Sequence, residues 1–181
     1  MNLLLGVTGG IAAYKACELT SLALKSGFDI EVIMTKNACQ FIGPITFEGL
    51  TGKAPHIDTF QSAMAHIDLG KWADICCVAP LSANSMGKMA NGLCDDMLST
   101  TLLALPLSCP LILAPAMNTH MWNHPLTQSN LKRLTDLPHV KIVSPVEKRL
   151  ACGDFGVGGL AAPADILSTL LAELSNPHQS S

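Results

Sequence analysis

The chain has 181 residues, enough for one α/β domain with a sizeable core. Its net charge of −3 and its aromatic content of 4% argue against a nucleic-acid-binding surface. Only 14% of the residues are charged, against about a quarter in ordinary soluble proteins. We therefore expect part of the surface to be covered by other copies of the chain in a homo-oligomer.

Seven cysteines are spread along the chain without C-x-x-C spacing. Such an odd set predicts neither a disulfide framework nor a zinc ribbon, and it indicates a reducing compartment. No stretch is long and apolar enough to span a bilayer, and the apolar start lacks the basic leader of a signal peptide. We expect a cytoplasmic protein with no membrane partner.

The first predicted element is a strand over the apolar residues 3–7, buried on both faces as parallel strands are. Thr8-Gly9-Gly10 then makes a tight turn into a helix, whose apolar positions recur at helical spacing up to Gly27. The glycines let a ligand approach the backbone closely, and the free N–H groups at a helix start favour an anion such as phosphate. A plain strand-to-helix turn without a ligand is the alternative for this stretch taken alone.

Further strands are predicted at residues 30–34, 75–79, 111–114 and 140–143. Helices are predicted at 37–42, 82–90, from 95 onward, at 126–134 and at 163–174. We expect residues 46–63 to be irregular with one weak strand at 56–59, and the glycine-rich residues 148–159 to form no regular element. The order predicts a single-domain, doubly wound parallel sheet with helices on both faces, a Rossmann-like or flavodoxin-like three-layer sandwich over residues 1–175, followed by a flexible tail at 176–181.

Polar and small residues follow each predicted strand. Thr35, residues 82–85 and residues 115–118 stand at three successive carboxyl ends, which meet at one edge of a parallel sheet. We expect the binding site at that edge. Asp95 and Asp96 open a predicted helix and are best interpreted as partners of its dipole rather than as catalytic acids. His120 and His124 have metal-ligand spacing, but no third ligand is in view, so we expect no metal site.

Five motifs in order, at residues 9–13, 66–69, 79–84, 115–118 and 150–154, resemble the homo-oligomeric flavin-containing cysteine decarboxylases. The resemblance extends from Leu3 to about Pro163, and it is strongest to the branch that acts on phosphopantothenoylcysteine in coenzyme A biosynthesis. It implies that FMN lies across the carboxyl edge of the sheet. The implied cofactor contacts are Gly9, Gly10, Ile11, Thr35, Ser82, Ala83, Asn84, Ser85 and Ala116.

The resemblance also implies a reaction. The substrate is oxidised to a thioaldehyde, loses CO2 and is reduced again at the enethiol stage to give 4′-phosphopantetheine. His66 corresponds to the family's catalytic base, which acts across a subunit boundary in a trimer or a multiple of trimers. Cys152 corresponds to the acid that protonates the enethiol. The implied substrate-binding residues are Met117, Asn118, Arg149, Leu150 and Ala151.

Asn118 and Cys152 also have interpretations that need no substrate. Asn118 is also a favoured helix N-cap, and both roles are compatible. An uncharged amide suits a departing carboxylate, because a fixed cation would stabilise the ground state. Arg149 is suited to the substrate phosphate. A lone cysteine such as Cys152 is usually a core residue, but the glycines around it favour a loop.

Three other functions fit parts of the pattern. A peptidyl-cysteine decarboxylase would share the fold, the flavin and His66, but the motif around Cys152 argues against it. A flavin prenyltransferase would lack the motif at 115–118. A non-catalytic regulatory subunit usually carries a long acidic tail. The chain also departs from the two-domain relatives, since Gly158-Gly159-Leu160 replaces their Gly-Arg-Met, and we expect another protein to supply the substrate.

Overall fold

The computed structural model describes residues 1–59, 63–149 and 155–175. Its strands are β1 (Asn2–Val7), β2 (Asp29–Met34), β3 (Ile75–Leu81), β4 (Leu111–Pro115), β5 (Val140–Ile142), β6 (Val146–Arg149) and β7 (Phe155–Gly159). Its α-helices are α1 (Lys15–Lys25), α2 (Pro44–Thr51), α3 (Ala65–Trp72), α4 (Ala83–Ala90), α5 (Met97–Ala104), α6 (Thr119–Asn123), α7 (Pro125–Thr135) and α8 (Pro163–Ser175). Two short 3-10 turns, η1 (Ile11–Tyr14) and η2 (Ala38–Gln40), follow β1 and β2.

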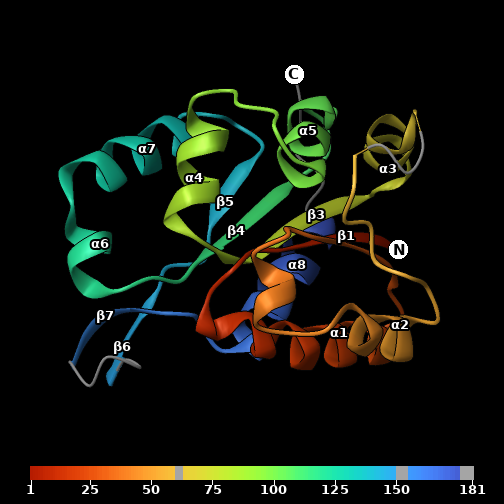
Figure 1. Ribbon diagram of the computed structural model, residues 1–181, viewed down its shortest axis with the longest axis horizontal. Coiled ribbons are helices and arrows are strands. Elements are labelled where there is room, and N and C mark those ends of the chain that lie inside the picture. The colour runs from red at the N-terminus through yellow and green to blue at the C-terminus, as the bar shows by residue number, and fades with distance from the viewer. Residues whose placement is uncertain (60–62, 150–154, 176–181) are drawn as a thin grey trace.

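The main sheet has five parallel strands in the order β2-β1-β3-β4-β5. This is the flavodoxin-like order, in which the chain moves away from β1 in opposite directions. Helices α1 and α8 cover one face, and α3, α4, α5 and α7 cover the other (Figure 1). The predicted three-layer α/β fold is confirmed.

β1 shows why its sequence does not alternate between apolar and polar residues. Leu3 and Leu5 belong to the core on the α1 and α8 face, whereas Leu4 belongs to the core on the opposite face. All three side chains are fully buried. A strand covered by helices on both faces needs apolar residues at every position.

The region expected to be irregular contains a helix, so that part of the prediction was wrong. Pro44 stands at the first turn of α2, and Gly52 ends the helix in the left-handed conformation. Phe47 is fully buried and anchors the helix. Pro at the start and Gly past the end are ordinary helix signals, but the two turns between them were too short to show a clear period. In place of the weak strand at 56–59 there is a single bridge between Ile33 and His56.

The glycine-rich segment also departs from the expectation, because β6 and β7 form an antiparallel hairpin beside the main sheet. Its glycines do not prevent strand formation, and they let the strand β7 lie close to the loop after β4. A Cβ atom at Gly158 would overlap the Met117 carbonyl oxygen, and φ at Gly158 is +150°. The Met117 N–H donates to the Gly158 carbonyl at 2.9 Å. The hairpin is thereby joined to the loop after β4.

Candidate active site

A pocket of about 460 Å³ opens at the carboxyl edge of the sheet, between the turns after β1, β3 and β4 and the β6–β7 hairpin. Its size is within the range of cofactor and substrate sites. The side chains and backbone that line it include these residues predicted from the sequence: Gly9, Gly10, Ile11, Ser82, Ala83, Ala116, Met117, Asn118 and Arg149. The expected location of the site at this edge agrees with the geometry.

The turn after β1 has two glycines in different surroundings: a side chain at Gly9 would overlap a neighbouring segment, whereas Gly10 faces open space. A Cβ atom at Gly9 would lie 2.6 Å from Cβ of Asn37 and 2.9 Å from its carbonyl carbon, so the turn packs directly on the segment after β2. Gly10 is extended, with φ of 172°, and no atom lies within 4 Å of the place its Cβ would occupy. A bare backbone therefore faces the pocket where the helical turn η1 begins, which suits an anionic or planar ligand.

Thr8, which the sequence analysis did not single out, joins two turns of the site. Its hydroxyl donates to the Pro80 carbonyl at 2.7 Å and accepts from the Ser82 N–H at 2.8 Å. The side chain is fully buried and also lines the pocket. The turn after β1 and the start of α4 are thus fixed relative to each other. No periodicity reveals this role, because the two partners lie 72 and 74 residues away in the chain.

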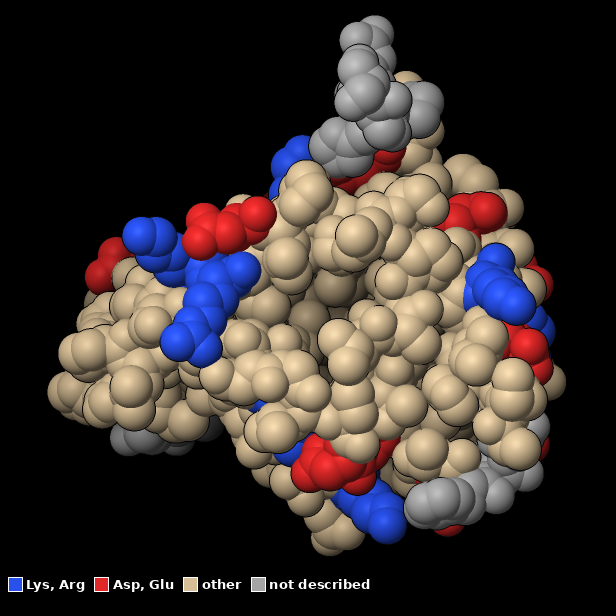
Figure 2. Space-filling model, turned by 90° about the horizontal axis from the view of Figure 1, so that it is seen from above, with Lys and Arg blue, Asp and Glu red and all other residues tan. Residues whose placement is uncertain are grey.

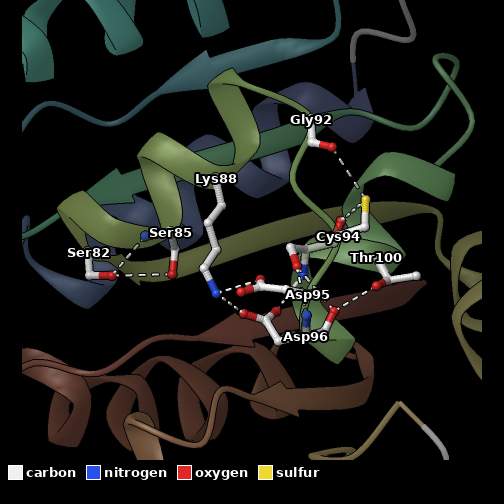
Figure 3. A network of polar contacts seen from close by, with 9 residues as sticks. Ser82, Ser85, Lys88, Gly92, Cys94, Asp95, Asp96 and Thr100 are labelled. Carbon is white, nitrogen blue, oxygen red and sulfur yellow. Dashed lines mark hydrogen bonds and ion pairs between the residues drawn. The ribbon is translucent and has the colours of Figure 1, made fainter.

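Ser82 is the N-cap of α4. Its hydroxyl accepts from the Ser85 N–H at 3.3 Å, and the two serine hydroxyls lie 3.2 Å apart (Figure 3). Ser82 and Ala83 line the pocket, whereas Asn84 and Ser85 are not among its lining residues. Ser85 is buried behind the N-cap.

Thr35 and Asn118 both cap short turns at the same edge. The Thr35 hydroxyl accepts from the Ala38 N–H at 3.2 Å, and Thr35 is not among the pocket-lining residues. The Asn118 side-chain oxygen accepts from the His120 N–H at 2.8 Å and so caps α6. Asn118 also lines the pocket, so its capping role and its position in the site coexist.

The two acids lie just before α5 rather than in its first turn, where the sequence predicts them as dipole partners, and both pair with Lys88. Lys88 Nζ lies 2.6 Å from Asp95 and 2.8 Å from Asp96, and Figure 3 shows it reaching from α4 to both carboxylates. Asp96 also accepts from the Ser99 N–H at 2.8 Å in a capping box. Burial raises the pKa of the Asp96 carboxyl, but the hydrogen bonds from Lys88 and Ser99 outweigh burial, so its pKa lies below the ordinary value.

His66 does not line this pocket. It lies on α3, which packs against α5 and β1. Its Nδ1 atom is buried and has no hydrogen-bond partner among the residues that the structure describes.

Some expected features fall elsewhere. Leu150, Ala151 and Cys152 lie outside the described residues. His124 caps α7, since its Nδ1 accepts from the Leu126 N–H at 3.2 Å. Within residues 1–59, 63–149 and 155–175, no three His, Cys, Asp or Glu side chains gather where they could hold a metal. None of the helices in these ranges is long and apolar enough to cross a membrane.

The pocket also has lining residues that the sequence analysis missed, namely Tyr14, Lys15, Met121 and Lys148. None of the described lining residues is acidic, although the chain as a whole has a net charge of −3. The pocket therefore favours anionic ligands.

Comparison with known proteins places the chain in a class: it belongs to the flavoprotein family, whose model, described as Flavoprotein, matches residues 1–175. A probable phosphopantothenoylcysteine decarboxylase of Streptococcus mutans is 39% identical over 96% of this chain and 98% of its own length. The coenzyme A biosynthesis bifunctional protein CoaBC of Bacillus subtilis is 46% identical over 92% of this chain, which spans only 41% of that relative.

Solved structures of similar proteins support the same family assignment. A PPC decarboxylase mutant, with a cysteine replaced by serine, in complex with pantothenoylaminoethenethiol, superposes with a TM-score of 0.85 at 33% identity, covering 96% of this chain and 98% of that one. The FMN-binding protein AtHal3 gives a TM-score of 0.84 at 34% identity and 98% coverage of both chains. The family resemblance carried by the five motifs is confirmed.

Proposed function

We propose that the chain catalyses the FMN-dependent decarboxylation of 4′-phosphopantothenoylcysteine to 4′-phosphopantetheine. The observation that carries this proposal is the convergence of the Gly9-Gly10 turn, Ser82 and Asn118 on one pocket that contains no described carboxylate. Relatives named for this activity, at 39% identity over nearly the full length of both chains, support it.

The bare turn at Gly9, Gly10 and Ile11, together with Ser82, Ala83 and Ala116, would hold FMN. Thr35, Asn84 and Ser85 remain proposed contacts at the same edge. When bound, FMN supplies the two-electron oxidation of the substrate's cysteinyl carbon and the later return of those electrons. The protein's part is to position the substrate, exclude water and move protons.

Asn118 and Met117 contact the substrate's carboxylate end in this proposal. The Asn118 amide orients the carboxylate without neutralising its charge. CO2 then leaves readily once the thioaldehyde, an electron sink β to the carboxylate, has formed. Arg149, Leu150 and Ala151 contact the rest of the substrate, with Arg149 toward the phosphate. Cys152 delivers the proton that completes reduction of the enethiol.

His66 is the base that removes the first proton, in the pocket of a neighbouring subunit. A homo-oligomer, a trimer or a multiple of trimers, would bring it there. Support comes from the sparse charge on one face: in Figure 2 the charged side chains gather toward the rim and the centre is uncharged. We place the enzyme in the cytoplasm, where its small-molecule substrate would be made.

The test is mass spectrometry of the products formed from phosphopantothenoylcysteine. Wild-type protein is expected to give 4′-phosphopantetheine, and Cys152→Ser is expected to accumulate a product two hydrogens lighter. A wild-type protein that stops at the lighter product would contradict the role of Cys152 and favour the peptidyl-cysteine decarboxylases. FMN binding without any decarboxylation would contradict the enzyme assignment.

A further inference from the structure

Two lysines from distant parts of the chain face the same pocket. Lys15 begins α1, and Lys148 lies on β6. Neither forms an ion pair with any residue that the structure describes, whereas Lys53, Lys88 and Lys141 all do. The stem of Lys148 lies against Gly159, since a Cβ atom at that glycine would overlap it. Because Gly159 has no side chain, the stem of Lys148 can lie directly against its backbone.

The two ammonium groups lie close enough to affect each other. Burial, and then the positive charge of Lys15, hold the pKa of the Lys148 side chain below its ordinary value. Two cations in a partly buried site with no described carboxylate repel each other, and an anion between them relieves the repulsion. A phosphate monoester, which carries nearly two negative charges at neutral pH, matches this arrangement.

The phosphate bound by these lysines could belong to FMN or to the substrate, and the position of Lys148 in the chain favours the substrate. FMN and the proposed substrate each carry one. Lys148 directly precedes Arg149 on the hairpin that we assign to the substrate, and Lys15, at the start of α1, faces the same pocket from a distant part of the chain. We propose that Lys15 and Lys148 together bind the phosphate of the substrate and make the enzyme selective for the phosphorylated form. This inference rests on the proposed function.

The test compares phosphopantothenoylcysteine with pantothenoylcysteine, which lacks the phosphate. Lys15→Met and Lys148→Met keep the apolar stem and remove the charge. Each is expected to lower the ratio of the two kcat/KM values by roughly 10-fold or more, as expected for the loss of one charge-assisted hydrogen bond. Lys148→Arg keeps the charge and should restore most of the ratio. The exposed Lys25, at the far end of α1, gives the matched control Lys25→Met, which should leave the ratio unchanged.

Binding of FMN and of riboflavin, followed by flavin fluorescence, separates the two sources of phosphate. The variants are expected to bind both flavins as the wild type does. If they weaken FMN but not riboflavin, the lysines serve the cofactor and the inference is overturned. An equal loss on both substrates would also overturn it, since a merely structural role gives that result. A wild-type enzyme inactive on both substrates would instead remove the proposed function, and this inference with it.

Discussion

Gly9 is restricted to glycine by the backbone of another segment. The predicted Cβ overlap is with Asn37, including its carbonyl carbon at 2.9 Å, and backbone cannot rotate away as a side chain does. Gly9→Ala is therefore expected to lower the free energy of unfolding by about 1–3 kcal/mol and to reduce FMN retention. Chemical unfolding and the flavin-to-protein absorbance ratio measure the two effects. Gly10→Ala is the matched control, because its Cβ meets no protein atom, and it should unfold like the wild type.

Asp96 gives the stability of the protein a defined pH dependence. Its folded-state pKa is lowered, so the carboxylate stabilises the fold above its unfolded pKa, and this contribution is lost as the pH falls through the folded pKa. Asp96→Ala is expected to cost about 1–2 kcal/mol at pH 7 through the lost N-cap, and less as the pH falls from about 5 to 3. Urea unfolding across that pH range measures this.

Asp96→Asn is the control for the same position. Asparagine keeps an oxygen that can accept from the Ser99 N–H but removes the ion pair with Lys88, so its stability should lie between those of the wild type and Asp96→Ala. A constant difference between wild type and Asp96→Ala at every pH would contradict the assigned role.

At the scale of elements, the hairpin of β6 and β7 packs closely against the loop after β4 at Gly158. Gly158→Ala must push the strand away from the Met117 carbonyl. Because Met117 and Asn118 line the pocket, we expect kcat/KM to fall by about 10- to 100-fold from misplacement of the substrate, with FMN binding retained. Steady-state kinetics and flavin titration test this. Gly27→Ala, at a positive φ but with open space around it, controls for backbone strain alone, and a comparable loss of activity there would contradict the argument.

The elements of the main sheet were predictable because β1, β3 and β4 are continuous apolar runs followed by glycine, serine or asparagine. The parallel order then placed the site at one edge. The hairpin was not predictable, since its glycines are required by contacts with Met117 and Thr119 that no local pattern encodes. Thr8 and the lysines of the pocket were missed for the same reason. The roles of His66, Cys152 and the other site residues remain predictions.

At the scale of the whole molecule, the proposal that His66 acts in the pocket of a neighbouring subunit leads to a mixing experiment, since His66 is not among the lining residues of the described pocket. His66→Asn and Cys152→Ser should each fail to form 4′-phosphopantetheine alone. If each active site combines the pocket of one subunit with His66 of the next, co-expressed variants should recover about a quarter of the wild-type activity, since random assembly places both intact residues together at that frequency. The yield of 4′-phosphopantetheine measures this. Activity no greater than that of either variant alone would show that the two residues do not act across subunits.

The parallel order of the main sheet places the carboxyl ends of all five strands at one edge and their amino ends at the other. The turns at 9–10 and 116–118 and the start of α4 at 82–85 follow the carboxyl ends of strands, whereas the turns at 26–28, 106–110 and 136–139 precede their amino ends. Lengthening a surface loop is thermodynamically cheap. Residues added beside the exposed Leu107 or Leu137 would therefore lie across the sheet from the pocket. Reporter groups attached on that side are expected to leave substrate access and flavin binding at the pocket unchanged, which kinetics and flavin titration of the labelled protein would measure.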